Sequence, residues 1–281
     1  MTFGELKHKI SHQFPALRIP KRTWYAMSYF NKKYPQILKW AFSSNENANY
    51  TYDLTESNIL YLAATIAVIT RVDRNQILAY INEARNDQAL KDQILSETMK
   101  SPFKEYADQR VDFGRRLGWY AFARALKPKI IVETGVDKGM GSVLLCSALL
   151  RNKQEGFDGQ FFGTDINPDA GYLLSGAYAQ MGKILYGDSI ESLLSFKNKI
   201  DLFINDSDHS ADYEYREYLT IKDMMSEHGV ILGDNSHTTD KLAIFSYQTN
   251  RNFLFFREEP RNHWYPGAGI GISFTNVSPK I

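Results

Sequence analysis

The chain of 281 residues contains one cysteine, Cys146, which excludes an internal disulfide bond. Because Cys146 lies within the apolar run of residues 143–150, we expect it to pack in a core. Long apolar runs are also lacking, since the longest, residues 59–70, is too short to span a bilayer. Residues 1–9 have no apolar core segment, so we expect no secretory signal peptide and a cytoplasmic location.

An excess of charge of either sign is missing as well. The chain carries 33 basic and 32 acidic residues, and we see no basic block that would follow a line of phosphates. We therefore expect neither nucleic acid nor a membrane as a partner. The aromatic content of 14% is typical of a filled globular interior, and the length allows a core domain with an accessory one.

Residues 1–104 show helical patterns and predict a helical accessory or lid region. Aromatic residues recur every three to five positions in residues 21–42, with Pro35 as an interruption. We expect this stripe to pack in a core, and a lid over an acceptor pocket is the alternative. Three further helices are predicted at residues 55–71 with Thr55 as N-cap, at 74–85 after Asp73, and at 88–100.

Residues 105–281 alternate between strand and helix patterns. We expect strands at 129–132, 160–165, 184–188, 200–206 and 229–235, and helices at 111–126, 142–150, 172–181, 189–196 and 211–228. Two closing strands, 253–256 and 270–274, are joined by a loop too short for a helix and are therefore antiparallel. The fold class that this indicates is α/β: a Rossmann-like doubly wound sheet of mainly parallel strands with a closing antiparallel hairpin.

A glycine-rich turn follows the first of these strands. Its pattern is E-x-G-x-x-x-G-x-G, from Glu133 through Gly135 and Gly139 to Gly141, and differs from the dinucleotide fingerprint G-x-G-x-x-G. A carboxylate at the strand end repels a pyrophosphate but suits a cationic or hydroxyl-rich ligand. The turn thus predicts a nucleotide-sized pocket that does not hold NAD, unless the glycines serve only a tight turn.

Each of the five parallel strands ends in an acidic residue. The five are Glu133, Asp165, Asp188, Asp206 and Asp234. Because the carboxyl ends of parallel strands share one edge of a sheet, we expect these side chains to surround one crevice. Carboxylates that are close together and desolvated repel each other unless cations or hydroxyl groups satisfy them.

At these residues the sequence resembles the class I S-adenosylmethionine-dependent methyltransferases. Within them it is similar to the small-molecule O-methyltransferase branch, which includes catechol and macrolide-sugar methyltransferases and cephalosporin-hydroxylase-like proteins. The resemblance covers residues 106–274 and implies transfer of a methyl group to a small-molecule hydroxyl, on a sugar or other secondary metabolite. A homo-oligomer is left open.

The resemblance implies roles for individual residues. Asp165 would accept both ribose hydroxyls, and Asp188 with Ser189 would read the adenine edge. The cofactor-binding residues implied are Glu133, Gly135, Gly139, Ser142, Asp165, Ile166, Gly187, Asp188, Ser189 and Asp206.

The resemblance also implies a divalent metal ion, Mg²⁺ as the first choice, held by Asp206, Asp234 and Asn235. Such an ion would lower the pKa of an acceptor hydroxyl. His209 stands where the catechol enzymes have a lysine, so His209 and Asp206 are the candidate catalytic residues. His237 is a weaker candidate base, and Asp208 is an alternative ligand.

Three other functions stay open. An oxidoreductase using a nicotinamide on the same fold is disfavoured by the missing fingerprint. A hydroxylase-like iron enzyme would draw on Asp206, His209 and His237. A non-catalytic binding protein would leave the same sequence pattern. The loop of residues 263–267, which contains Trp264, could contact an acceptor, although turn packing is the simpler explanation.

Overall fold

The structure is a computed structural model that describes residues 15–234 and 236–275. Two compact units divide the chain. Unit 1 comprises Met1–Ser44 and Asn262–Tyr265, and unit 2 comprises Asn45–Arg261 and Pro266–Ile281. The units divide after residue 44, whereas the sequence placed its boundary after residue 104. The physical reason is that the helices of residues 56–70 and 74–85 pack with each other and with the helix of residues 116–126 in unit 2.

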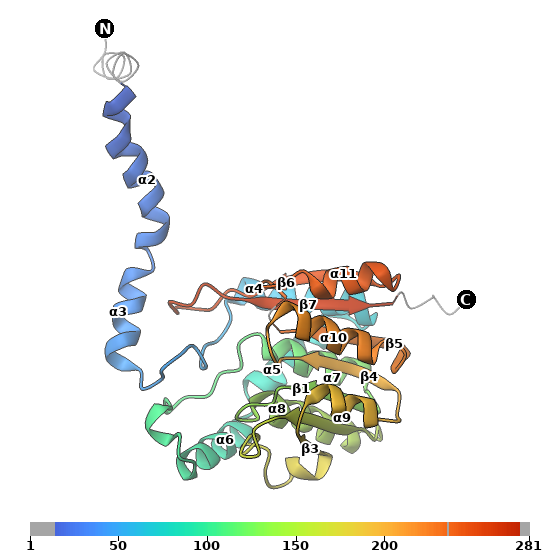
Figure 1. Cartoon of the computed structure of the whole chain (residues 1–281). Helices are drawn as coiled ribbons and strands as arrows, with labels where there is room; N and C mark the ends of the chain where they lie inside the picture. Colours follow the sequence, from blue (N-terminus) through green and yellow to red (C-terminus); the bar gives the residue numbers. More distant parts are fainter. Residues whose placement is uncertain (1–14, 235, 276–281) are drawn as a thin grey trace. The chain divides into compact units, whose positions relative to one another are not determined.

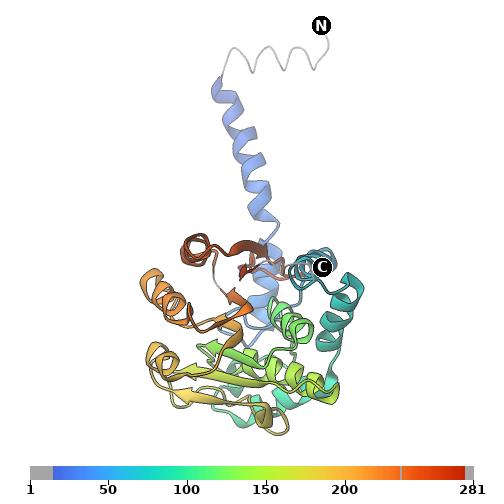
Figure 2. The same ribbon diagram turned by 90° about the vertical axis from the view of Figure 1, so that its right-hand side faces the viewer.

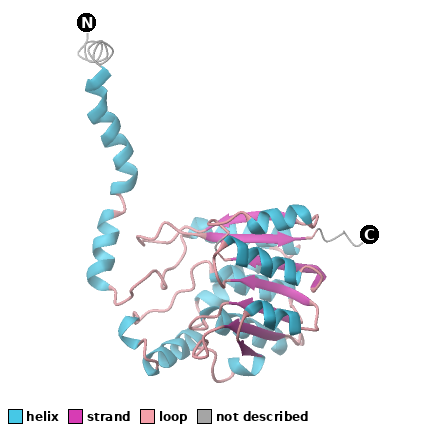
Figure 3. Cartoon of the chain, in the orientation of Figure 1, coloured by secondary structure: helices cyan, strands magenta, loops and turns pink. Residues whose placement is uncertain are grey.

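A seven-stranded sheet forms the centre of unit 2 (Figure 3). Its strands are β1 (Ile130–Thr134), β2 (Gln160–Asp165), β3 (Gly182–Tyr186), β4 (Ile200–Asn205), β5 (Met225–Gly233), β6 (Asn252–Arg257) and β7 (Gly269–Phe274). The order is β3-β2-β1-β4-β5-β7-β6, in which the first five are parallel and β7 is antiparallel to both neighbours. This confirms the fold class, with the acidic residues of the five parallel strands at one edge.

Helices cover both faces of the sheet (Figures 1 and 2). One layer contains α4 (Glu56–Thr70), α5 (Arg74–Arg85), α7 (Arg116–Leu126) and α8 (Met140–Gln154), with α6 (Gln88–Lys100) beside it. The opposite layer contains α9 (Ser189–Ser195), α10 (Ala211–Ile221) and α11 (Lys241–Gln248). Short 3₁₀ turns are η2 (Lys104–Tyr106) and η3 (Tyr178–Met181).

The predicted caps of the first helices of unit 2 are confirmed. The Thr55 hydroxyl accepts a hydrogen bond from the Asn58 amide at 3.3 Å and starts α4. The Asp73 carboxylate accepts from the amides of Asn75 and Gln76 and starts α5, whose bounds match the prediction. These side chains replace partners that the first turn of a helix lacks.

Three predicted helices differ from the structure. The helix expected at 172–181 is only the turn η3, because Gly171 and Gly176 adopt left-handed backbone angles of +80° and +57° that break a helix. The helix expected from 111 starts at Arg116, since the Gly114 amide bonds to the Tyr52 carbonyl instead. The helix expected to reach 228 ends at Ile221, and β5 begins at Met225. Helix α11 was not predicted.

The two faces of the sheet bury separate apolar layers. On the α9–α11 face, Phe203 of β4 and Ile231 of β5 pack with Tyr218 and Phe245 from the helices. On the other face, Cys146 of α8 is fully buried, as predicted, and burial raises the pKa of its thiol well above the ordinary value. The continuous apolar character of β1 and β4 follows from this two-sided burial.

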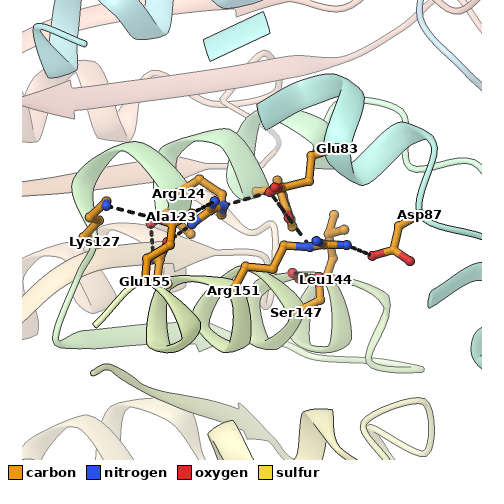
Figure 4. Close-up of polar contacts among 11 residues, drawn as sticks. Glu83, Asp87, Ala123, Arg124, Lys127, Leu144, Ser147, Arg151 and Glu155 are labelled. Carbon is orange, nitrogen blue, oxygen red and sulfur yellow. Dashed lines mark hydrogen bonds and ion pairs between the residues drawn. The ribbon is translucent and has the colours of Figure 1, made fainter. Parts of the chain in front are cut away.

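Arg124 links three helices of the α7 and α8 layer (Figure 4). Its guanidinium donates to Glu83 of α5 at 2.8 Å, to Asn152 of α8, and to Glu155 at the end of α8 at 2.5 Å. The side chain is only 3% exposed, so these acceptors replace the water that the charge loses on folding. Lys127 bonds the same Glu155 from the surface, at 3.0 Å.

Unit 1 contains the turn η1 (Pro15–Arg18) and the helices α2 (Ile19–Asn31) and α3 (Tyr34–Ser43). The Lys33 ammonium donates to the His263 carbonyl at 3.0 Å, and the rings of Trp40 and Trp264 lie 5.2 Å apart. Trp264 thus packs on its own unit, as the turn-packing explanation of the 263–267 loop required. Neither helix contains a buried residue, so the prediction that the aromatic stripe of residues 21–42 packs in a core is wrong.

Replacing Arg124 by methionine should lower the free energy of unfolding by roughly 2–4 kcal/mol, because the buried Asn152 oxygen and two carboxylates lose their donor. The matched variant Lys127→Met removes an exposed partner of the same Glu155 and should cost less than about 1 kcal/mol. Urea denaturation of both variants measures the difference. Equal losses would contradict the role given to Arg124.

Candidate functional site

A cavity of about 640 Å³ lies at the carboxyl edge of strands β1 to β5. Predicted site residues that line it are Gly135, Asp165, Ile166, Gly187, Asp188, Ser189, Asp206, His209 and Asp234. The other lining residues are Tyr50, Arg115, Arg116, Asp137, Thr164, Asn167, Ser207, Asp208 and Tyr213. Glu133, Gly139 and Ser142 lie outside the lining, and Asn235 lies outside the described residues.

Gly135 brings the ends of β1 and β4 close together. Its φ angle is +77°, and a Cβ placed there would lie 2.2 Å from the carbonyl oxygen of Asp206. Any other residue would push the two strand ends apart. The glycine therefore lets the backbone itself form one wall of the cavity, as the sequence pattern predicted.

Glu133 points into the protein behind this turn. Its side chain is buried, accepts a hydrogen bond from the Ser142 hydroxyl at 2.7 Å, and lies where a Cβ on Gly141 would clash. Burial raises the pKa of the Glu133 carboxyl to about 8, although the Ser142 hydroxyl opposes the shift. At neutral pH the carboxyl is therefore mainly protonated. Ser142 serves this contact, and Gly139 precedes the first residue of α8.

Asp165 and Asp188 line the cavity from neighbouring strand ends. Asp165 accepts from the backbone amides of Asp137 and Asn167, both at 2.9 Å. Asp188 caps α9 by accepting from the Glu191 amide and also accepts from the Tyr213 hydroxyl at 2.8 Å. Burial raises the pKa of Asp188, but these hydrogen bonds outweigh it and the pKa is lowered. Because a carboxylate has about four acceptor positions, both groups keep capacity for a ligand.

Arg115 neutralises the acidic residue at the end of β5. Its guanidinium donates through Nε to Asp234 at 2.6 Å and through a second nitrogen to the other Asp234 oxygen. It also donates to Glu258 at 3.2 Å and to the Tyr52 hydroxyl at 2.9 Å. Burial would raise the pKa of Asp234, but Arg115 lowers it below the ordinary value. Arg115 and Asp234 are both buried, so the pair replaces solvent for each charge.

Asp206 lies between this ion pair and a second arginine. The nearest guanidinium nitrogen of Arg116 is 3.8 Å from the Asp206 carboxyl. Burial and the neighbouring Asp234 raise the pKa of Asp206 well above its ordinary value, against the effect of both arginines. A raised pKa favours the protonated form of the Asp206 carboxyl, and protonation lessens the repulsion between two close carboxylates.

Two of the three predicted metal ligands, Asp206 and Asp234, lie beside arginines, and the third, Asn235, is outside the described residues. The Arg115 guanidinium donates to both oxygens of Asp234, and its positive charge disfavours a divalent cation at that carboxylate. Within residues 15–234 and 236–275, no cluster of three or more His, Cys, Asp or Glu side chains could hold a metal. The iron site considered from Asp206, His209 and His237 has no support, since His237 is exposed and does not line the cavity.

Glu217 of α10 connects the ends of two strands and the start of a helix beside the cavity. Its buried carboxyl accepts from Thr134 at 3.3 Å, from Ser207 at 2.6 Å, and from Ser189 and Asn205. Burial raises its pKa, although these four donors oppose the shift. These hydrogen bonds hold together the ends of β1 and β4 and the start of α9. They thereby fix Ser189 and Ser207, which line the cavity.

Two buried polar atoms of the lining lack a hydrogen-bond partner among the described residues: Nε of Arg116 and the hydroxyl of Thr164. Such atoms cost free energy unless a ligand or water satisfies them. Sequence reasoning missed both arginines. The sequence did contain a signal for them, because two adjacent arginines stand at the start of the helix α7. The positive end of the helix dipole disfavours cations there, unless acidic groups lie nearby.

The free energy of unfolding should fall as the pH rises from about 4.5 to about 8, because folded Glu133 keeps a proton that the unfolded chain releases. Glu133 contributes most below its unfolded pKa, and its effect is lost as the pH rises through the folded pKa. The Glu133→Gln variant should lack this contribution, at most about 1.4 kcal/mol per pH unit. Urea denaturation across this range tests it. Parallel pH profiles for both proteins would rule it out.

Comparisons with known proteins agree with this geometry. Residues 132–236 match the sequence profile of a family described as "Methyltransferase domain". A methyltransferase structure from Geobacter sulfurreducens is 15% identical, with a TM-score of 0.50 over 73% of this chain and 99% of its own. The O-methyltransferase TomG from Streptomyces achromogenes, in complex with SAM, is 14% identical, with a TM-score of 0.50 over 68% and 91%.

The search of curated protein sequences finds no match. At these identities the solved structures show the fold alone, and the family profile covers the strand ends β1, β2, β3, β4 and β5. Over the domain that carries the strand-end motifs, the resemblance to class I S-adenosylmethionine-dependent methyltransferases is confirmed.

Proposed function

We propose that this protein is an S-adenosylmethionine-dependent O-methyltransferase that acts on a hydroxyl group of a small molecule. The observation that carries the proposal is that Asp165 and Asp188 face one cavity beside the Gly135 turn. Carboxylates with unused acceptor positions suit the ribose hydroxyls and exocyclic amine of a nucleoside. The match of residues 132–236 to a methyltransferase domain supports the same function.

The residues of the cavity fit such a ligand at both ends. Arg116 carries an unpartnered Nε in the lining, and a guanidinium suits the carboxylate of an amino-acid group. Thr164 adds an unpartnered hydroxyl beside Asp165. When bound, S-adenosylmethionine supplies the methyl group on its sulfonium. The chain holds the two reactants in line, which contributes on the order of 7–11 kcal/mol to the rate in such reactions.

His209 is the better of the two candidate bases. Asp206 already interacts with Arg116 and with the neighbouring Asp234. His209 lines the same cavity, and histidine is the side chain that most often acts as a general base. The acceptor hydroxyl would give its proton to His209 as its oxygen bonds to the methyl carbon, while the carbon–sulfur bond breaks and its electron pair stays on sulfur as a neutral thioether. A positioned base contributes roughly 10²–10⁴-fold to such steps.

Metal assistance stays a prediction of the sequence. Arg115 and Arg116 already bring two fixed positive charges to Asp206 and Asp234. We therefore propose transfer that relies on these guanidinium groups, with the acceptor hydroxyl activated by His209. A cytoplasmic location and a secondary-metabolite acceptor are parts of the same proposal.

Calorimetric titration of the full chain with S-adenosylhomocysteine should show one saturable site, whereas NAD should show none. The Asp165→Asn variant should weaken binding at least about tenfold, because an amide cannot accept two hydroxyl donors with full charge. Asp158→Asn, an exposed position just before β2, is the matched control and should bind as the wild type does. NAD binding would favour the oxidoreductase, and absence of binding by either ligand would refute the proposed function.

Titrating MgCl₂ or MnCl₂ into the S-adenosylhomocysteine complex should give no saturable heat, because the Arg115 guanidinium on Asp234 repels a cation there. Thermal midpoints with and without EDTA should agree within error. A saturable ion whose binding is lost in Asp206→Asn, but not in Asp158→Asn, would overturn the arginine-based proposal in favour of the metal.

A further inference from the structure

The described part of unit 1 has charge of one sign only. Residues 15–44 and 262–265 contain no aspartate or glutamate, and their basic residues are Arg18, Lys21, Arg22, Lys32, Lys33 and Lys39. Since the whole chain has 33 basic and 32 acidic residues, taking away these six leaves 27 basic against 32 acidic in the remainder. The balanced total thus hides two regions of opposite net charge.

Helix α2 separates apolar from basic residues around its axis. At 3.6 residues per turn, Ile19, Met27 and Phe30 lie on one face, with Trp24 at its edge. Lys21 lies on the opposite face with the tyrosines at 25 and 29, whose rings contact each other edge to face. Tyrosines beside basic residues, across from an aliphatic face, are typical of a helix at a lipid surface.

Helix α3 also exposes apolar residues. Leu38 and Phe42 share a face one turn apart, Lys39 flanks that face, and Trp40 lies on the opposite side. Trp40 packs on Trp264 and so fixes the helix to the second segment of its unit. The remaining apolar side chains have no such contact.

The apolar face is uncovered by the rest of the unit. Neither helix has a buried residue, and the exposed fractions are 72% for Trp24, 74% for Phe30 and 89% for Phe42. Single exposed apolar residues are common, but a row of them along two consecutive helices exposes a surface that water disfavours.

We infer that the helices α2 and α3 bind an anionic lipid bilayer, with the apolar face in the interface and the lysines and arginines among the headgroups. Charge complementarity carries this choice, since the described residues of the unit have six cationic side chains and no carboxylate side chain, which favours a negatively charged surface, and the apolar row favours hydrocarbon. Among the described residues no helix has the length and apolarity needed to cross a bilayer, so the helices would lie along its surface.

Two other occupants suit the surface less well. A second copy of the chain would bring two basic helices together, and residues 15–44 and 262–265 offer no acidic side chain as a partner. Nucleic acid would satisfy the lysines and arginines but would leave Ile19, Met27 and Leu38 in water. The inference also departs from the expectation that no membrane binds, which rested on the charge of the whole chain.

Flotation of the full chain with lipid vesicles tests the inference. One set consists of neutral phosphatidylcholine, and the other contains about one third anionic phosphatidylglycerol. The protein should float with the anionic set at about 0.1 M salt, and raising the salt to about 1 M should weaken this at least tenfold. Binding to neutral vesicles should be at least tenfold weaker as well.

Two variants separate charge from apolar contact, and each has a matched control in unit 2. The charge variant is Lys21→Glu, Arg22→Glu, Lys32→Glu, with the exposed control Lys153→Glu, Lys197→Glu, Lys222→Glu. The apolar variant is Trp24→Ser, Phe30→Ser, with the exposed control Leu194→Ser, Tyr247→Ser. Both variants should float at least about tenfold less than wild type, and both controls should float as wild type does.

Circular dichroism and S-adenosylhomocysteine titration should be unchanged in all four proteins, which shows that unit 2 stays folded. The inference is overturned if the wild type fails to float, if neutral and anionic vesicles bind it equally, or if the variants float like the controls. Binding of duplex DNA without vesicle binding, or a dimer that the apolar variant abolishes, would assign the surface to those partners instead.

Discussion

Negative charge gathered at one edge of a parallel sheet is the constraint on which this structure depends. Asp165, Asp188, Asp206 and Asp234 face a single cavity, and groups so close repel each other once water is withdrawn. Other groups of the chain reduce this repulsion, and they do so differently at each carboxyl group. Backbone amides satisfy Asp165, a guanidinium pairs with Asp234, and the raised pKa of Asp206 favours its neutral form.

Because the carboxyl groups are satisfied differently, the cavity has two ends with different hydrogen-bonding character. The carboxylates at the ends of β2 and β3 remain acceptors, since each still has unused oxygen positions. Near β4 and β5 the arginines from the start of α7 offset the charges of Asp206 and Asp234, and Arg116 keeps an Nε donor without a partner among the described residues. A ligand with hydroxyl or amine donors at one end and a negative group at the other therefore fits better than either kind alone. Below both regions, Glu217 fixes the strand ends with four donors.

Local patterns in the sequence predicted much of the fold. The Asp73 cap and the bounds of α5 follow from side chain and backbone within a few residues, and the five parallel strands follow from their apolar runs. The pairing of Arg115 was beyond such reasoning, because its partners lie 119 and 143 residues away. The same holds for the missing helix at 172–181, where two glycines that adopt left-handed angles outweighed the helical pattern. The roles of the individual site residues were carried by family resemblance, and binding experiments must test them.

The burial of Cys146 makes this protein well suited to site-directed labelling. It is the only cysteine of the chain, it lies fully enclosed in α8, and its raised pKa keeps it as the unreactive thiol. A cysteine introduced at an exposed position would therefore be the one nucleophile that a maleimide or a nitroxide reagent meets in the folded state. Cys146 therefore need not be replaced before labelling. A probe attached to one introduced cysteine can report on the local environment of either unit in an otherwise unaltered chain.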